Sequence, residues 1–247
     1  MPRLVAFDLD DTLAPSKSPV DPTMAELLRR LLEQTDVCVI SGGRFEQFRD
    51  QLLSRLPTST TLERLHLMPT CGTRYLRWDH TRWRLQYAEN LSDDERAEAL
   101  AAVEEEASRL GLWEERTWGP VIEDRGSQIT FSALGQSAPI EDKSGWDPGG
   151  SRRSALRAAV QSRLPGLEVR AGGSTSIDIT RRGVDKAYGM AKLAALSGIP
   201  LADMLFVGDR LDPEGNDYPV IALGLRTRAV ADWTETALLV EQLITAA

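Results

Sequence analysis

The sequence predicts a discontinuous α/β fold, in which a parallel sheet with covering helices is interrupted by an α+β insertion. Near both ends of the chain, short apolar runs alternate with amphipathic helical segments, a pattern typical of parallel strands joined by right-handed crossovers. In the middle, amphipathic strands and helices replace that alternation, which indicates an antiparallel layer. We therefore expect a core formed by residues 1–87 and 184–247, and an inserted domain over residues 88–183.

Three apolar runs near the N-terminus predict buried strands, at residues 4–7, 37–40 and 65–68. A helix is expected after the first strand, because Asp21 is a favoured N-cap and Pro22 is tolerated at the first helical position. A second helix is expected after the glycine turn that follows the second strand. Residues 75–87 then alternate aromatic and charged side chains around a turn, which predicts an antiparallel hairpin.

The inserted segment carries its own helix and strand signals. Ser92 and Glu95 have the spacing of a capping box, so a long helix is expected to begin at Ser92. Amphipathic strands are expected at residues 128–132 and 176–180, with a helix between them at residues 151–164. The stretch 135–150 is rich in glycine, proline and serine, and we expect a mobile loop there.

The first pattern returns after Gly183. A helix is expected over residues 185–196, and a fourth buried strand over residues 204–207 ends at Gly208-Asp209. Two further short strands and a closing helix are expected at residues 220–223, 227–230 and 232–244.

Composition and charge exclude several classes of function. The net charge is −8 and the pI is near 5.0, so the chain has no general attraction for nucleic acid or an anionic membrane. No apolar run approaches the roughly 20 residues that span a bilayer, and Asp8 comes too early for a secretory signal. We therefore expect a cytoplasmic protein.

The chain has two cysteines and two histidines, too few for a zinc site or a Ser-His-Asp triad to be expected. Cys38 and Cys71 lie in apolar or turn contexts and are expected to be buried, reduced thiols. Catalysis would have to use carboxylates, lysine, hydroxyl groups and a hard metal ion.

An acidic cluster follows the first predicted strand, where open parallel sheets bind their ligands. Asp8 and Asp10 can converge on one point if the chain turns, so that one carboxylate attacks phosphorus and the other acts as general acid and base. Both carboxylates can also help to hold Mg²⁺, which prefers oxygen ligands. The alternative is an acidic turn in which Asp11 and Thr12 cap a helix.

Two further groups suit phosphate chemistry. Ser41, with Gly42 and Gly43, offers a hydroxyl and backbone N–H groups at a helix N-terminus, which is an anion site; the alternative is a plain glycine turn. Lys186 comes near the start of a helix, where a cation opposes the helix dipole. That placement makes sense if Lys186 faces phosphate and an aspartate, whereas most lysines lie at the surface.

An acidic loop, residues 208–217, follows the fourth predicted strand. Four acidic groups and an amide in ten residues would repel one another unless water or a cation neutralised them. A calcium loop is the rival interpretation, but the spacing lacks the alternating ligands and the terminal glutamate of an EF-hand.

Taken in this order, the four segments resemble the motif set of the haloacid dehalogenase (HAD) superfamily, and the insertion has the place of a type-C2B cap. The resemblance implies a Rossmann-like core with a substrate-specificity cap, Mg²⁺ as cofactor and an aspartyl-phosphate intermediate on Asp8. It also implies a phosphate site at Ser41, Gly42 and Lys186. The metal site implied is Asp8, Asp10 and Asp209, supported by Asp212, Asn216 and Asp217.

The closer resemblance is to eukaryotic-type phosphomannomutases. Their Asp-x-Asp-Gly-Thr-Leu opening is matched by Asp8, Asp10, Thr12 and Leu13. Their metal loop is matched by Gly208, Asp209, Pro213, Gly215, Asn216 and Asp217. The Gly-Gly-x-x-Ser-x-Asp strand of their cap is matched by Gly172, Gly173, Ser176 and Asp178. The resemblance implies a phosphorylated small substrate, a hexose phosphate, and a homodimer formed through the cap. The substrate-binding residues implied are Lys17, Arg44, Arg125, Lys143, Ser176 and Asp178.

The chain departs from the family pattern at several positions. Asp11 replaces a glycine, and the turn at Ser41 is one residue shorter. Gln136 and two lysines, Lys17 and Lys143, stand where the family has arginines. Lysine binds phosphate as a point charge and not as a planar fork, so a weaker grip on a distal phosphate is expected.

Three hypotheses therefore remain. We favour phosphomannomutase-like phosphoryl transfer, with a sugar-phosphate phosphatase as the alternative. A non-catalytic signalling module is the third, because receiver domains also combine strand-end aspartates with a lysine. Receiver domains are about half as long as this chain and have no inserted cap.

Overall fold

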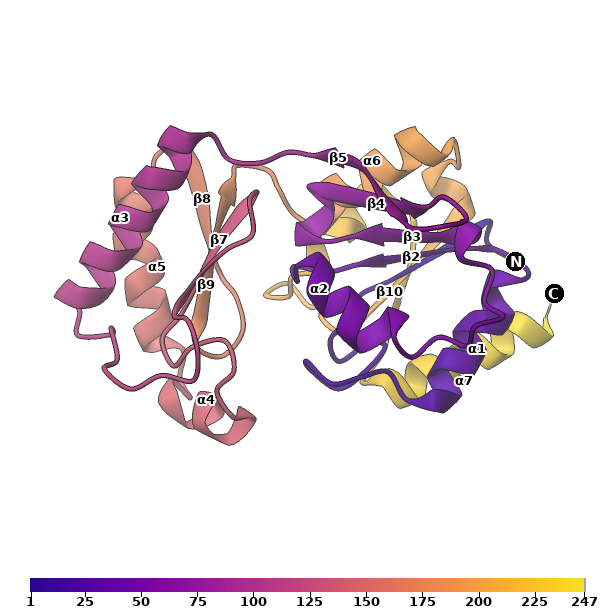
Figure 1. Cartoon of the computed structure of the whole chain (residues 1–247), viewed down its shortest axis with the longest axis horizontal. Coiled ribbons are helices and arrows are strands. Elements are labelled where there is room, and N and C mark those ends of the chain that lie inside the picture. Colours follow the sequence, from indigo (N-terminus) through magenta and orange to yellow (C-terminus); the bar gives the residue numbers. More distant parts are fainter. Residues whose placement is uncertain (247) are drawn as a thin grey trace. The chain divides into compact units, whose positions relative to one another are not determined.

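The structure is a computed structural model that describes residues 1–246. It divides into two compact units, one formed by Met1–Ala88 with the segment that begins at Val184, and the other by Glu89–Gly183 (Figure 1). The first boundary differs from the predicted one by one residue, since Ala88 belongs to the first unit. No helix within residues 1–246 is long and apolar enough to cross a membrane.

The first unit contains a seven-stranded sheet in the order β11-β10-β1-β2-β3-β4-β5. The first five strands in this order are mutually parallel, and the β4–β5 hairpin adds two antiparallel strands at one edge. The strands are β1 (Leu4–Phe7), β2 (Asp36–Ile40), β3 (Leu65–Met68), β4 (Arg74–Trp78), β5 (Trp83–Ala88), β10 (Met204–Gly208) and β11 (Arg226–Ala229). This is the Rossmann-like sheet that the sequence predicts.

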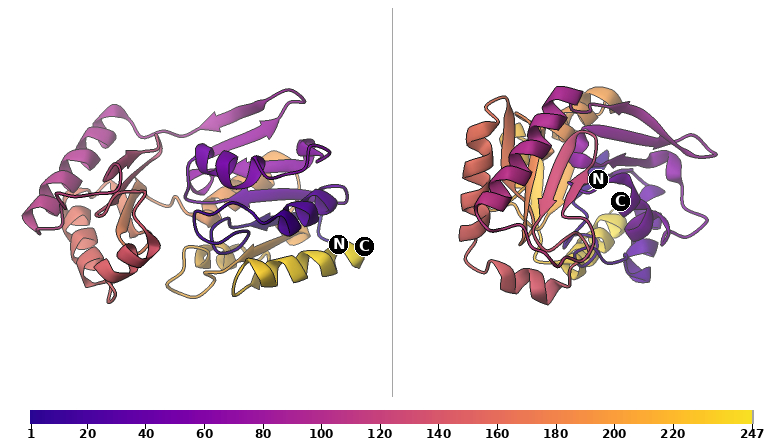
Figure 2. Two further views of the ribbon diagram at one scale, coloured as in Figure 1. Left: turned by 60° about the horizontal axis from the view of Figure 1, so that its bottom comes forward. Right: turned by 60° about the vertical axis from the view of Figure 1, so that its left-hand side comes forward.

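Both faces of this sheet are buried, as is usual for parallel sheets. Val5 and Phe7 of β1 pack in the cluster that contains residues of α1 and α7, whereas Leu4 and Ala6 pack in the cluster that contains residues of α6. Figure 2 shows α1 and α7 lying side by side. The helices of this unit are α1 (Pro22–Leu32), α2 (Phe45–Phe48), which continues as a π-helix (Arg49–Leu53), α6 (Lys186–Ser197) and α7 (Trp233–Thr245).

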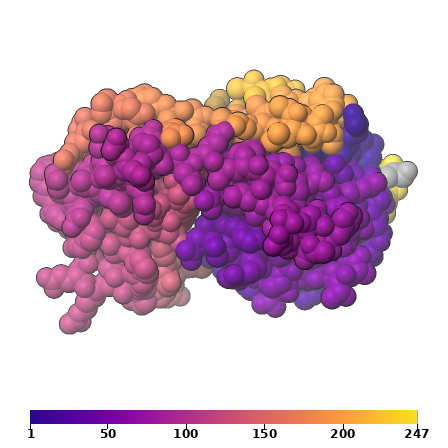
Figure 3. All heavy atoms as spheres, turned by 45° about the horizontal axis from the view of Figure 1, so that its top comes forward, coloured from indigo at the N-terminus to yellow at the C-terminus, as the bar shows by residue number. Residues whose placement is uncertain are grey.

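Helix α6 also packs against the β4–β5 hairpin. The Lys192 ammonium lies over the rings of Tyr87 and Tyr188, 4.8 and 5.3 Å from their centroids. Figure 3 shows α6, in orange, beside the hairpin, in purple. The contact with Tyr87 joins α6 to the last residues of β5, whereas the contact with Tyr188 lies within α6.

The second unit is a four-stranded antiparallel sheet in the order β6-β7-β9-β8 with helices on one face. Apolar side chains at alternate positions, such as Ile129 and Phe131 of β7, pack against α3 and α5. Its elements are α3 (Asp93–Arg109), β6 (Ile122–Asp124), β7 (Gln128–Ser132), α4 (Ile140–Trp146), α5 (Ser151–Arg163), β8 (Leu167–Ala171) and β9 (Ser176–Arg181). The capping box of Ser92 and Glu95 is confirmed at the start of α3.

Several local predictions are wrong. Residues 140–146 of the expected mobile loop form helix α4, and β6 and β8 were not predicted. Residues 218–223 form a 3₁₀-helix instead of a strand. The Val220 N–H donates to the Asp217 carbonyl, which turns this segment away from strand geometry, and Pro219 has no N–H for a ladder. Cys38 is a buried free thiol as expected, but Cys71 is only half-buried.

Candidate active site

Asp8 lies directly after β1, where its backbone N–H donates to the Val207 carbonyl of β10. Its carboxylate is 5% exposed, and its Oδ1 is 2.7 Å from Nζ of Lys186. Lys186 is the first residue of α6 and is fully buried, so the surface-lysine alternative is excluded. The same ammonium lies 2.5 Å from Oδ1 of Asp217, so Lys186 bridges two carboxylates from distant parts of the chain.

The bridge places two carboxyl groups against one buried ammonium. Burial raises the pKa of Asp8 to about 8, Asp217 adds to the rise and Lys186 opposes it. Burial alone would lower the pKa of Lys186, but Asp8 and Asp217 outweigh it and raise the pKa above its usual value. The raised pKa of Asp8 is therefore that of a buried carboxyl group that shares its one ammonium with a second carboxyl group.

A third carboxyl group lies near these two. Asp8, Asp209 and Asp217 each offer an oxygen within 4.8 Å of the others. Asp209 is oriented by Thr12, whose hydroxyl donates to Asp209 Oδ1 at 3.2 Å and accepts from the Asp209 N–H at 3.1 Å. Burial and then Asp217 raise the pKa of Asp209. Three hard oxygen donors sharing one ammonium fit a divalent cation such as Mg²⁺.

Asp10 faces a different set of donors from this three-carboxylate group. Its Oδ1 accepts from the Lys17 N–H at 2.7 Å and from Gln51 Nε2 at 3.2 Å, and its Oδ2 accepts from Gln47 Nε2 at 2.8 Å. Its hydrogen-bond donors therefore differ from the ammonium of Lys186, which contacts Asp8. The sequence argument missed both glutamines, although they are four apart in the helix that follows the Ser41 turn.

The loop after Asp10 explains one departure from the family pattern. Asp11, which stands in place of a glycine, has φ +60°, a left-handed conformation that aspartate tolerates better than most residues. Its N–H donates to the Ala14 carbonyl, and its carboxylate accepts from the Ser16 N–H. The helix-cap alternative does not describe Asp11 and Thr12, because these residues build the turn and the Asp209 contact.

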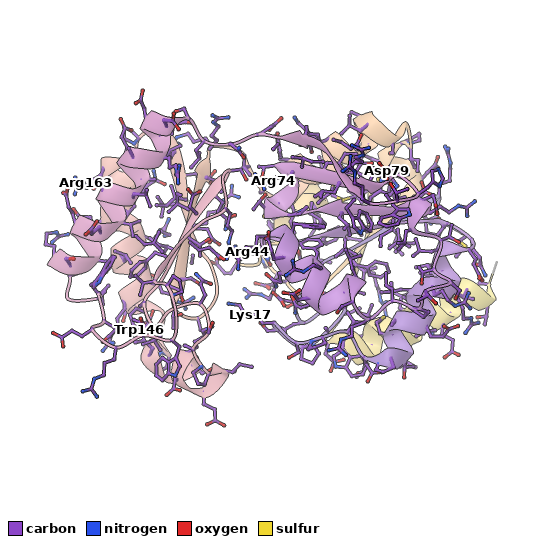
Figure 4. The ribbon with its side chains drawn as sticks, viewed as in Figure 1. Lys17, Arg44, Arg74, Asp79, Trp146 and Arg163 are labelled. Atoms are coloured by element: carbon purple, nitrogen blue, oxygen red, sulfur yellow. The ribbon has the colours of Figure 1, made fainter. Side chains whose placement is uncertain are left out.

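The Ser41 turn is held by the turn that follows β3. Ser41 is buried, and its Oγ accepts from the Gly43 N–H at 3.1 Å. The Cys71 and Thr70 N–H groups donate to the Ser41 and Gly43 carbonyls, while Thr70 and Cys71 have φ of +49° and +53°. Figure 4 shows the core cations Lys17 and Arg44 at one edge of the first unit.

The loop after β10 contributes unequally to the site. Asp217 is fully buried, and its Oδ2 accepts from the Arg210 N–H at 3.1 Å. Asp212 and Asn216 are exposed, and Asp212 pairs with Arg210. Gly215 has no room for a side chain, because a Cβ there would lie 1.9 Å from the Arg210 carbonyl oxygen. Glycine is therefore needed where the chain passes Arg210, two residues before the buried Asp217.

The expected cap residues lie in the second unit. Asp178 Oδ1 accepts from Gln128 Nε2 and Thr130 Oγ1, at 2.9 and 2.7 Å, and Ser176 is two residues earlier on the same strand. A Cβ on Gly172 would lie 2.9 Å from Asp178 Oδ2, which explains this glycine. The motif therefore presents Ser176 and Asp178 on one face of β9.

The expected cap cations already have partners within their unit. Arg125, in the turn between β6 and β7, donates to Glu123 Oε2 at 2.8 and 2.6 Å. Lys143 Nζ donates to the Gln136 carbonyl at 2.9 Å. The positions of Gln136 and Lys143 are therefore neighbours in space.

The doubly wound core, the inserted α+β unit and the Asp8–Lys186 site define an enzyme of the HAD superfamily, a phosphotransferase or phosphohydrolase. The family model "Eukaryotic phosphomannomutase" matches residues 24–242, and the chain belongs to that family.

Individual relatives are distant. The chain is 24% identical over 225 residues to phosphomannomutase 1 of Homo sapiens, covering 89% of this chain and 83% of that protein. It is also 24% identical to phosphomannomutase of Saccharomyces cerevisiae, covering 88% of this chain and 84% of that protein.

Two solved structures show the same fold. N-terminally truncated IMP-nucleotidase of Plasmodium falciparum has a TM-score of 0.71 at 15% identity, covering 98% of this chain and 70% of that chain. A trehalose-6-phosphate phosphatase related protein has a TM-score of 0.61 at 17% identity, covering 98% and 97%.

Proposed function

We propose that the chain transfers a phosphoryl group of a sugar phosphate through an aspartyl-phosphate intermediate on Asp8, with Mg²⁺ as cofactor. The observation that carries this proposal is the buried contact of Asp8 with Lys186, beside Asp209 and Asp217. A carboxylate held against an ammonium in a metal-binding acidic group suits attack on phosphorus, where charge neutralisation dominates catalysis. The sugar phosphate is supported by the names of the curated relatives.

Asp8 attacks phosphorus in line, and the bond from phosphorus to the ester oxygen breaks. Asp10 gives its proton to that leaving oxygen. Lys186, the Ser41 hydroxyl and the backbone N–H groups of the glycine turn hold the oxygens of the transferring group. Mg²⁺ would be held by Asp8 and Asp209, with Asp10 as the third expected ligand, and would supply further charge neutralisation.

The intermediate is then resolved by a second in-line attack. Asp10 removes a proton from the incoming oxygen as it bonds to phosphorus, and the bond to Asp8 breaks. The incoming group is water in a phosphatase and a sugar hydroxyl in a mutase. In the mutase, Ser176 and Asp178 are the cap residues proposed to bind sugar hydroxyls, and Arg125 and Lys143 are those proposed to bind the distal phosphate. Lys17 and Arg44 are the substrate-binding residues proposed for the core.

Mutase activity is the leading form of the proposal because of the family match. Hydrolysis is the second candidate, and Gln136 is the residue that favours it, since a neutral amide replaces an arginine of the family pattern. A bisphosphate intermediate that is held less firmly is released or hydrolysed before it can reorient.

A phosphate-release screen over hexose phosphates with Mg²⁺, run with and without a hexose bisphosphate, tests the proposal. Isomer exchange that the bisphosphate stimulates would support the mutase, and steady release of free phosphate without it would support the phosphatase. Asp8→Asn is expected to abolish either activity. Turnover that survives in Asp8→Asn would overturn the assignment of Asp8 as nucleophile. No turnover of any substrate by the wild type would overturn the enzyme proposal and favour the signalling module.

The homodimer and the cytoplasmic location stay predictions. Light scattering would be measured on the purified chain and on a variant in which a short linker replaces residues 89–183. The comparison would show whether self-association depends on the inserted unit. Fractionation of cells would test the location.

A further inference from the structure

The carboxylate of Asp10 is held by two glutamine side chains that belong to one continuous helical segment. Gln47, in α2, donates to Oδ2 at 2.8 Å, and Gln51, in the π-helix that continues α2, donates to Oδ1 at 3.2 Å. Both donors are neutral amides, so they fix the direction of the carboxylate without cancelling its charge. The Lys17 N–H completes the set on Oδ1.

Gln51 is locked in this orientation. The residue is 4% exposed, and its Nε2 donates to the Ser18 carbonyl at 2.8 Å as well as to Asp10. Its Oε1 is buried with no hydrogen-bond partner among the described residues. Flipping the amide would place Oε1 against two acceptors, so the unsatisfied oxygen follows from keeping both N–H groups on Asp10 and Ser18.

The local helix geometry supports this arrangement. Residues 49–53 are π-helical, with the Ser54 N–H donating to the Arg49 carbonyl, and such single turns are frequent at functional sites. The Gln51 carbonyl also accepts from the Val20 N–H, so the π-turn is tied to the end of the loop that carries Lys17. Gln51, within this turn, donates to both the Ser18 carbonyl and the Asp10 carboxylate.

Gln47 links Asp10 to the anion-binding turn. A Cβ built on Gly43 would lie 2.1 Å from Gln47 Oε1, so the glutamine amide occupies the space that a side chain at position 43 would need. The amide therefore lies against the Ser41 turn on one side and bonds to Asp10 on the other. Gly43 is required for this contact, not for an unusual backbone angle.

We propose that Gln47 and Gln51 are positioning residues that hold the Asp10 carboxylate in the orientation from which it exchanges protons with the ester and incoming oxygens. The inference rests on the proposed phosphoryl transfer and deepens it. The glutamines do not touch the transferring group. They act through Asp10, so replacing them should lower the rate of the first step only where proton transfer to the leaving oxygen limits that rate.

The test compares two leaving groups in the first turnover. An alkyl phosphate such as a hexose phosphate needs its leaving oxygen protonated, whereas p-nitrophenyl phosphate leaves as a stable anion. Gln47→Ala is expected to slow the single-turnover cleavage of the hexose phosphate at least tenfold, and that of p-nitrophenyl phosphate less than threefold, within the range of acid–base catalysis. Gln47→Glu, which sets a carboxylate against Asp10, is expected to show the same selective loss.

Two controls and a folding check accompany the test. Gln86→Ala, a change at an exposed glutamine of β5, is expected to alter neither rate. Asp10→Asn should reproduce the selectivity of Gln47→Ala in a stronger form. Because Gln51 is buried, Gln51→Glu is assayed alongside Gln51→Ala, with thermal unfolding to show that each variant is folded.

Equal losses with both leaving groups, or rates for Gln47→Ala that equal those of Gln86→Ala, would overturn the inference. If the wild type cleaves neither ester, the proposed function itself has failed. If the wild type is active and Asp8→Asn is not, while the glutamine variants lack leaving-group selectivity, only the positioning role is wrong.

Discussion

Gly72 and Gly189 touch where helix α6 crosses the turn that follows β3. A Cβ on Gly72 would lie 2.4 Å from the Gly189 Cα, and a Cβ on Gly189 would lie 2.7 Å from the Cys71 carbonyl oxygen. The contact lets the first turn of α6, with Lys186 at its start, approach the edge of the sheet at which Asp8 lies. Two residues without side chains thus set the depth at which Lys186 lies.

Replacing Gly189 by alanine should destabilise the protein, although the same replacement inside a helix usually stabilises it. Glycine to alanine normally stabilises a helix interior, but Gly189→Ala would clash with Ile40 and Cys71 and should cost about 1–3 kcal/mol. Gly145, which lies in α4 with open space around it, is the matched control, and Gly145→Ala should stabilise by about 0.4–1 kcal/mol. Urea unfolding of both variants measures the difference, and a stabilised Gly189→Ala would show that the helix contact is loose.

Removing Lys186 should damage stability as well as activity. Lys186→Met leaves Asp8 and Asp217 buried without their cation, which typically costs about 3–5 kcal/mol. The double variant Lys186→Met/Asp217→Asn removes one of the stranded charges, so part of the stability should return while activity does not. Lys192→Met, on the same helix, should change stability much less; equal effects of the two lysine changes would contradict the bridge described above.

Magnesium should stabilise the first unit. An ion bound only by the folded state raises the free energy of unfolding by about 2.7 kcal/mol at one hundred times its dissociation constant. Asp209→Asn removes one of the three clustered carboxylates and should abolish most of this shift. Asp212→Asn, an exposed residue of the same loop, should leave it intact. Thermal unfolding with Mg²⁺ and with EDTA gives the comparison, and identical curves for the wild type would argue against a metal site.

The inserted unit should lose stability in acid through Glu95. Its carboxylate accepts from Arg181 and from the Ser92 N–H, and these bonds lower the pKa of Glu95 to about 2. Because the folded pKa lies below the usual 4.5, the contribution is complete above that value and is lost as the pH falls from 4.5 toward 2. Glu95→Gln should flatten this part of the pH–stability curve, whereas Glu104→Gln, at an exposed site of the same helix, should not.

Restoring the family arginine at position 136 should change the fate of the phosphorylated intermediate. Gln136 lies beside Lys143, so Gln136→Arg would add a planar phosphate fork next to an existing ammonium. We expect the ratio of isomer exchange to phosphate release to rise several-fold, measured by phosphorus NMR with a hexose bisphosphate present. Gln136→Leu controls for the loss of the amide, and an equal ratio in both variants would mean that charge at this position is irrelevant.

Much of the fold follows from local pattern. The start of α1 at Pro22, the Ser92–Glu95 capping box and strand β3 were predicted to the residue, because caps and short apolar runs involve neighbouring residues only. The errors have equally local causes. The sequence Leu-Glu-Val-Arg-Ala of β8 alternates clearly but was not used, and the glycine content of 135–150 concealed a short helix with Gly145 inside it.

By itself, the sequence determined the buried strands of the core at residues 4–7, 37–40, 65–68 and 204–207 and the polar groups at their ends, since periodicity and motif spacing are properties of contiguous residues. Only the tertiary structure decided that Lys186 joins Asp8 to Asp217, that Asp209 completes their group, and that Asp10 faces Gln47 and Gln51 instead. These choices depend on contacts between elements far apart in the chain. Burial and the close approach of α6 to the sheet determine those contacts. A local sequence pattern does not predict how closely a helix packs against a sheet.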